Sequence, residues 1–209
     1  GDYGSNKVKF GAYYGGSSKR NIKNVDLKNN RKNTWGTGLI FNHEIDSIQN
    51  VTVAAGFTRQ ISENANKTAY YSNAYALGLA YNFVHTTYGL DLAHKDTKNK
   101  GGAGNKVKNN EVTAVIRQGL NEDWNVYAMY SYKTEKTLPV GSAYSKSTDR
   151  QFLVGTEYYV FKQGSVKVKP FIEWQATRTK YENTFDKDSG KQLDRSRDFK
   201  TVIGLRAYW

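Results

Sequence analysis

The strongest constraint on the fold is an alternation of apolar and polar residues that recurs along almost the whole chain. In residues 75–83 the odd positions are Tyr, Leu, Leu, Tyr and Phe, separated by Ala, Gly, Ala and Asn. The pattern recurs in residues 7–16, 35–44, 51–58, 88–93, 112–120, 124–132, 152–160, 166–175 and 199–209. A period of two indicates strands, and no segment has a convincing helical period. We therefore predict an all-β chain of about ten strands.

The faces of these strands differ from those of a soluble sheet. One face is apolar and aromatic, whereas the other carries Gly, Ala, Ser, Thr, Asn and isolated charges. A soluble barrel points its apolar face inward, while a membrane barrel points it toward lipid and lines its lumen with small or polar residues. Most segments also have the length of about 9–13 residues that crosses a bilayer at a tilt. We predict a single domain, residues 1–209, that forms a transmembrane up-and-down antiparallel β-barrel of about ten strands.

Connection lengths between the predicted strands alternate regularly. Short connections fall at 46–50, 85–86, 121–123 and 162–164, and long ones at 17–33, 62–70, 95–109, 134–149 and 180–197. Short periplasmic turns and long external loops are typical of outer-membrane barrels. With an even number of strands, both termini are expected on the side of the short turns. Inward glycines such as Gly36, Gly38, Gly56, Gly78 and Gly89 are expected to relieve crowding in a narrow barrel.

Several other chain types are excluded. The sequence has no run of about eighteen apolar residues, so a membrane helix is not expected. Aromatic residues make up 14% of the chain, which argues against disorder. Cysteine is absent, which excludes disulfides and thiolate metal sites. No basic-then-apolar leader is present, so we expect a mature or a cytosolic chain.

The last predicted strand ends in an aromatic residue, Trp209, preceded at alternate positions by Ala207, Leu205 and Ile203. This ending resembles the C-terminal strand of bacterial outer-membrane proteins. The resemblance implies an integral protein of the bacterial outer membrane, closed by its first and last strands and inserted by the barrel-assembly machinery. Outer-membrane lipid and lipopolysaccharide are the surroundings that it implies.

The chain carries a formal charge of +12, and much of the excess falls in two of the long connections. The basic residues there are Lys19, Arg20, Lys23, Lys28, Arg31, Lys32, Lys95, Lys98, Lys100, Lys106 and Lys108. Clustered like charge attracts anionic partners, so these residues are candidates for binding polyanions such as acidic saccharides. Their other interpretation is accommodation to anionic lipopolysaccharide. Nucleic acid is not an expected partner, because aromatic residues are not interleaved with these charges.

Charges of both signs fall on the predicted lumen face. They are Lys9, Glu44, Asp91, Arg117, Glu157, Lys167, Lys169, Glu173, Lys200 and Arg206. Charges in a lumen must pair or stay hydrated, so they predict either a constriction that selects solutes or a salt-bridged plug. Ten strands lie closer to the filled eight-stranded barrels than to the open sixteen-stranded ones. We expect a narrow or partly occluded lumen, in which Glu157, Glu173, Arg117 and Arg206 are able to pair.

Catalytic signs are sparse. His94 lies beside Asp96 and near Asp91, and this Asp/His pair resembles the omptin proteases in residue type only, without a second acidic pair. No serine has a base at a spacing that points to a hydrolase, and the glycines of residues 101–104 do not open a helix as a phosphate loop would. We predict no enzyme activity, no cofactor and no metal.

Three functions are compatible with these patterns. The first is a narrow passive channel for small anionic solutes. In size, basicity and tyrosine content the chain resembles the small monomeric acidic-sugar porins of the oligogalacturonate type, which implies this function and makes twelve the alternative strand count. The second is a surface adhesin that binds acidic glycans or other polyanions through basic extracellular loops. The third is the membrane anchor or translocator barrel of a longer protein.

Overall fold

The computed structural model describes residues 1–16, 29–64, 69–99, 105–139, 143–164, 166–185 and 190–208. Ten long strands and two short ones cover most of these ranges. The long strands are β2 (Asn6–Gly15), β3 (Asn29–Asp46), β4 (Gln49–Asn64), β5 (Ala69–Phe83), β6 (Thr86–Asn99), β7 (Lys106–Gly119), β8 (Trp124–Leu138), β9 (Ser145–Tyr158), β11 (Val166–Glu182) and β12 (Arg195–Tyr208). The short ones are β1 (Asp2–Tyr3) and β10 (Phe161–Gln163). The all-β prediction is confirmed.

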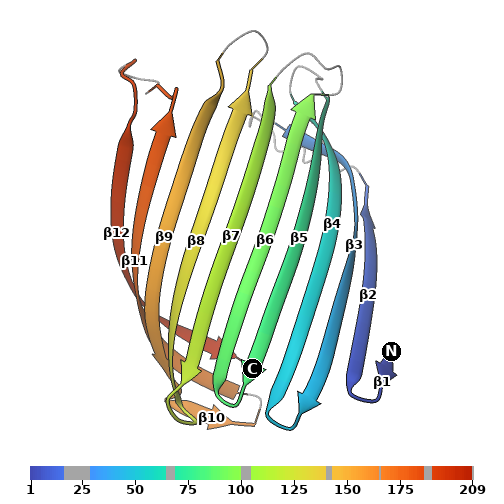
Figure 1. Ribbon diagram of the computed structural model, residues 1–209, viewed down its shortest axis with the longest axis vertical. Helices are drawn as coiled ribbons and strands as arrows, with labels where there is room; N and C mark the ends of the chain where they lie inside the picture. Colours follow the sequence, from blue (N-terminus) through green and yellow to red (C-terminus); the bar gives the residue numbers. More distant parts are fainter. Residues whose placement is uncertain are drawn as a thin grey trace, which may run out of the picture.

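All strands belong to one antiparallel sheet, in which each long strand pairs with its neighbours along the chain. Figure 1 shows the strands running up and down in sequence order, with both chain ends at the end of the short turns. The register is continuous over most ladders; between β5 and β6, for example, Tyr75 is opposite His94 and Tyr81 is opposite Tyr88. The short strands β1 and β10 fold back onto β2 and β11. The predicted up-and-down antiparallel topology is therefore present.

No helix in the described ranges is long and apolar enough to span a membrane.

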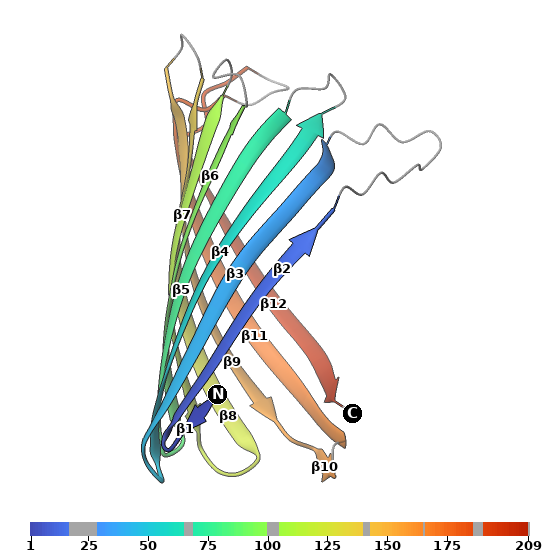
Figure 2. The same ribbon diagram turned by 90° about the vertical axis from the view of Figure 1, so that its right-hand side faces the viewer.

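The predicted closure by the first and last strands is absent from this structure. The ladders end at β12 on one side, and β2 has no partner beyond β1 and β3. Figure 2 shows that the sheet is strongly curved, and Figure 1 shows its edge strands β12 and β2 on opposite sides. The sequence could not decide this point, because side chains alternate between faces in an open curled sheet as they do in a barrel. Closure depends instead on strand number, tilt and stagger together.

The short connections are turns close to where the sequence places them. Asp46 begins one of them, and its carboxylate accepts hydrogen bonds from the backbone N–H of Ile48 and the side chain of Gln49, both at 2.9 Å. In another turn, the side-chain oxygen of Asn121 accepts hydrogen bonds from the backbone N–H groups of Asp123 at 2.9 Å and Trp124 at 2.8 Å. Such side-chain bonds stabilise tight turns locally.

At the opposite end the strands are longer than predicted. β6 continues to Asn99 and β7 begins at Lys106, so most of the predicted long connection 95–109 is a ladder, in which Asp96 is opposite Lys108. Strand β3 likewise begins at Asn29 rather than near residue 35. These segments are charged and polar, a composition that predicts loops. Backbone pairing with a neighbouring strand extends the ladder through such segments where their side chains stay hydrated.

Apolar side chains lie on one face of the sheet, and none of the described hydrophobic side chains is buried. We call this the apolar face; it includes Leu77 and Leu79 of β5 and Ile172 and Trp174 of β11, all 38–45% exposed. The buried side chains are polar or charged instead: Thr34, Ser131, Thr148, Glu157 and Lys169. This distribution is the inverse of that in a soluble protein, where buried charges are rare and hydrophobic residues form the core.

The opposite, polar face carries glycines beneath large side chains from neighbouring strands. An added Cβ at Gly36 would lie 2.6 Å from the Tyr13 ring, at Gly155 2.6 Å from the Tyr127 ring, and at Gly204 2.6 Å from the Phe171 ring. Of the glycines predicted to relieve crowding, Gly36, Gly78 and Gly89 have such close neighbours, at 2.6–2.9 Å. Gly38 and Gly56 do not, since their nearest neighbours are at 3.7 and 3.8 Å.

Candidate functional site

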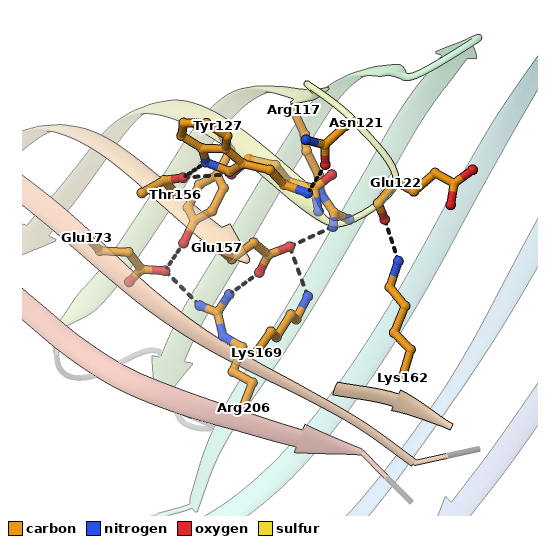
Figure 3. A network of polar contacts seen from close by, with 12 residues as sticks. Arg117, Asn121, Glu122, Tyr127, Thr156, Glu157, Lys162, Lys169, Glu173 and Arg206 are labelled. Carbon is orange, nitrogen blue, oxygen red and sulfur yellow. Dashed lines mark hydrogen bonds and ion pairs between the residues drawn. The ribbon is translucent and has the colours of Figure 1, made fainter. Parts of the chain in front are cut away.

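Six side chains from five strands meet on the polar face near the short-turn end. They are Arg117 of β7, Tyr127 of β8, Glu157 of β9, Lys169 and Glu173 of β11, and Arg206 of β12, and we call them the Glu157 cluster. Figure 3 shows them pointing toward one another across the sheet. Side chains of β7 and β12 both reach the middle strand β9. The polar face is therefore the concave one, because side chains diverge on a convex face.

Glu157 is the centre of the cluster and is 3% exposed. Its Oε1 atom accepts from Arg117 at 2.6 Å and from Lys169 at 2.9 Å, and its Oε2 atom accepts from Arg206 at 2.8 Å. One carboxylate thus contacts three cations. A buried carboxylate needs this many charge-assisted hydrogen bonds, because desolvation is costly unless both oxygens have partners.

Glu173 forms the second half of the cluster. Its Oε1 atom accepts a hydrogen bond from Arg206 at 2.6 Å and another from the Tyr127 hydroxyl at 2.6 Å. Arg206 therefore bridges the two carboxylates with separate nitrogens. Three cations face two carboxylates, which leaves one net positive charge. Of the three, Lys169 is buried, whereas the Arg117 side chain is 45% exposed.

Aromatic rings hold the two cations nearest the sheet edge. The Arg206 guanidinium lies 4.0 Å from the centroid of the Phe171 ring, and the Lys169 ammonium lies 5.1 Å from that of Tyr159 and 5.3 Å from that of Tyr208. Phe171 itself occupies the space above Gly204, so a larger residue at position 204 would displace it. Cation–π contacts fix these side chains in one orientation.

The structure brings together half of the predicted lumen charges. The predicted pairing of Glu157, Glu173, Arg117 and Arg206 is present, and Lys169 joins it. The others lie apart from the cluster: Glu44 pairs with Lys7 at 3.1 Å, Lys200 with Asp198 at 3.3 Å, Lys9 lies on edge strand β2, Asp91 on β6, and Lys167 opposite Tyr208. Tyr127 is not among the predicted site residues, because its place opposite Arg117 on β7 depends on the strand register.

The half of the polar face over β2 to β6 carries mostly small side chains. A hollow of about 780 Å³ lies over β2 to β6, and its polar-face lining is mostly glycine and alanine, such as Gly38, Gly56, Ala76 and Gly78. Lys9, Tyr13 and Asp91 are its larger polar residues. The concave face therefore has two halves. The half over β2 to β6 has small side chains and a hollow, and the charged half over β7 to β12 holds the Glu157 cluster.

The predicted polyanion-binding residues do not form one described cluster. Lys19, Arg20, Lys23, Lys28 and Lys100 lie outside the described residues, as does Trp209, and the side chains of Arg31 and Lys32 are not described either. Lys95 pairs with Asn109 in the register of the polar face, whereas Lys108 is opposite Asp96 on the apolar face. Because β6 and β7 form a ladder here, Lys95 and Lys108 lie on opposite faces of the sheet.

The predicted His94–Asp96 pair is present in the structure. His94 contacts Asp96 at 3.2 Å and Asn110 at 2.6 Å, and its ring stacks on Tyr75. Asp91 does not join them, because three residues along a strand place it on the opposite face. In the described part of the chain no group of three or more His, Asp or Glu residues is placed to hold a metal ion.

No protein-family model matches the chain, and no curated protein matches it either.

Proposed function

We propose that this chain is an integral β-barrel of the bacterial outer membrane, in which β2 and β12 pair to enclose a narrow passage for small anionic solutes. The observation that carries this proposal is the inverted burial. None of the described hydrophobic side chains is buried, while Glu157 and Lys169 are buried on the polar face. An apolar face of this extent needs a nonaqueous surrounding, which lipid supplies around a barrel.

The aromatic residues of the apolar face support a membrane position. Near the longer-connection end, Trp35, Phe57 and Tyr75 form a row with ring centroids 5.0–5.1 Å apart. Near the short-turn end, Tyr81 and Tyr88 stack at 6.3 Å. Tyr75 and Tyr81 are six residues apart on β5, which corresponds to about 20 Å along the strand. Two aromatic girdles that flank an apolar band of about 25 Å are typical of barrels that cross a bilayer.

The concave face supports a passage rather than a solid plug. Closure would place the half with small side chains, over β2 to β6, opposite the charged half over β7 to β12. The small residues would leave room for a solute, and the cluster would supply a fixed positive charge. Arg117, whose side chain is the most exposed of the three cations, is best placed to meet an anion in transit. Rings of fixed charge select ions in pores in this way.

Planar-bilayer recording of the purified full chain tests this proposal. We expect discrete single-channel currents and a reversal potential, under a salt gradient, that indicates preference for anions. Arg117→Glu should shift the reversal potential toward cation preference. Arg59→Glu is the matched control, because Arg59 stacks on Tyr71 on the apolar face and should leave selectivity unchanged. A chain that inserts into the bilayer but carries no current would overturn the channel.

A further inference from the structure

A second group of charges lies on the apolar face, at the ends of β8, β9, β11 and β12 farthest from the short turns. It surrounds a groove of about 380 Å³. The groove is lined by Tyr132, Lys146, Thr148, Arg150, Arg178, Lys180, Glu182 and Arg195. We call it the arginine groove. Its members share the face of Trp174 and Ile172, because they occupy the same alternate positions of their strands.

The ladder register sets like charges directly against one another here. Arg178 on β11 is opposite both Arg150 on β9 and Arg197 on β12. Two residues farther along β11, Lys180 is opposite Arg195. Like charges in directly opposite positions destabilise a sheet. A row of three arginines across adjacent strands is therefore unfavourable unless an anion lies between them.

The described acidic residues do not neutralise this row. Glu182 lies 3.7 Å from both Lys146 and Lys180, and Asp194 lies 3.9 Å from Arg195. None of the described carboxylates is within ion-pair distance of Arg150 or Arg178. Five cations line the groove against the single carboxylate of Glu182, which leaves a net charge of four positive.

The groove begins directly beyond an aromatic row. Phe152 and Phe199 flank Ala176, two residues along the strands from Arg150, Arg197 and Arg178. Two residues correspond to about 7 Å. Trp174 stacks on Phe199 with ring centroids 6.2 Å apart. The arginine row thus lies one step beyond this aromatic row. If the aromatic row marks the membrane interface, the arginines lie at the depth of the lipid phosphates.

We propose that the arginine groove binds the phosphate of an anionic lipid headgroup in the outer leaflet, an inference that rests on the proposed membrane position. Two arginines on adjacent strands, about 4.8 Å apart, can hold one phosphate with several parallel N–H donors. The acyl chains of the same lipid then lie along Phe152, Trp174 and Phe199. This apolar continuation selects a lipid over free phosphate, which has no apolar part to bury.

The test uses the full chain reconstituted in phosphatidylcholine nanodiscs and titrated with bisphosphorylated lipid A. Retained lipid is counted by native mass spectrometry. Replacing both arginines, in Arg150→Gln/Arg178→Gln, should weaken binding about 100-fold, since each charge-assisted contact contributes roughly ten-fold. Arg178→Lys should weaken it less, because the charge stays and the paired donors are lost. Arg59→Gln, which removes one positive charge from the same face outside the groove, should bind as the unmodified chain does.

Two further arms identify the source of the phosphate. Lipid A without its phosphates should bind only weakly to the unmodified chain. Its affinity should not exceed that of bisphosphorylated lipid A for the double variant. Inorganic phosphate at millimolar concentration should not displace the lipid; displacement would overturn the lipid proposal in favour of a free anion. Equal lipid binding by the double variant and the unmodified chain would overturn the proposed lipid site and leave the proposed membrane position intact. If the unmodified chain fails to insert into the nanodisc, the membrane proposal falls with it.

Discussion

At the scale of single residues, Glu157 holds together the cations in the charged half of the concave face. Its two oxygens contact Arg117, Lys169 and Arg206, and no other described carboxylate reaches the first two at ion-pair distance. Removal of this one anion would leave three cations close together, with only Glu173 to neutralise Arg206. The carboxylate is therefore the one group that contacts all three cations.

Glu157→Gln should lower the free energy of unfolding by about 3–5 kcal/mol, the usual cost of breaking a buried ion pair from one side. Urea titration in phosphatidylcholine vesicles, followed by tryptophan fluorescence, measures it. Glu44→Gln is the control, because the Lys7–Glu44 pair is half-exposed and should contribute less than about 1 kcal/mol. Similar losses for the two variants would contradict the central role of Glu157.

Gly155 gives an independent residue-scale prediction. A methyl group there would lie 2.6 Å from the Tyr127 ring, so Gly155→Ala should displace the ring and weaken its hydrogen bond to Glu173. Overpacking of this kind costs about 1–3 kcal/mol. Gly38→Ala, where the nearest atom is 3.7 Å away, should be nearly neutral in the same urea titration. An equally neutral Gly155→Ala would show that Tyr127 moves without cost.

The membership of the Glu157 cluster could be predicted only in part from the sequence. Alternation along the strands placed Arg117, Glu157, Glu173 and Arg206 on one face, which was enough to expect that they could pair. The distances between strands depend on the register, which alternation does not give. That is why Tyr127 was missed, and why Lys9 and Asp91 were grouped with residues that lie far across the sheet.

At the scale of the strands, the two faces of β11 carry the functional argument. Ile172 on the apolar face is 45% exposed, and Gln175 on the polar face lies between Leu153 of β9 and Lys200 of β12. The same strand therefore offers one position expected to meet lipid and one expected to meet water. A charge placed at each position distinguishes the two environments.

Ile172→Lys should destabilise the inserted chain by about 2–4 kcal/mol, the cost of lysine near the middle of a bilayer. Gln175→Lys should cost much less, since the added ammonium stays hydrated on the concave face. Unfolding by urea in vesicles compares the two variants. If Ile172→Lys is tolerated as well as Gln175→Lys, the apolar face does not contact lipid.

Strand existence and strand faces could be predicted from the sequence, whereas strand ends could not. The alternation of residues 75–83 is strong enough to identify β5 by itself. Residues 95–99 and 106–109 look like a basic loop in the sequence, yet they extend β6 and β7, and the backbone pairing sets Asp96 opposite Lys108. Long-range pairing supplies this information, and local composition does not contain it.

At the scale of the whole molecule, the open edge between β2 and β12 is the feature that alternation could not predict. Both edge strands expose large apolar side chains; Phe10 is 73% exposed and Ile203 is 76% exposed. They also leave backbone N–H and C=O groups without a strand partner. Such groups cannot remain unpaired in a bilayer, so the proposed membrane position requires the two edges to pair.

Disulfide trapping tests this closure, since the chain has no native cysteine. Ala12→Cys on β2 is combined in turn with Ile203→Cys, Leu205→Cys or Ala207→Cys on β12. In vesicles, one of these pairs should form a disulfide under mild oxidation, detected by its migration on a nonreducing gel. Ala12→Cys with Ala128→Cys on β8 is the control and should stay reduced. Absence of a disulfide in all three pairs would contradict the barrel.

Because every long strand pairs with its sequence neighbours, each ladder is contained within a stretch of adjacent chain. A break between Asn99 and Lys106 would separate the chain into two fragments joined by the β6–β7 ladder. Co-expressed fragments should therefore reassociate into a complex that co-purifies through a tag on either one. If they do not, the connection itself is needed to guide assembly. The meander would thus make the protein divisible, with its two parts exchangeable between variants.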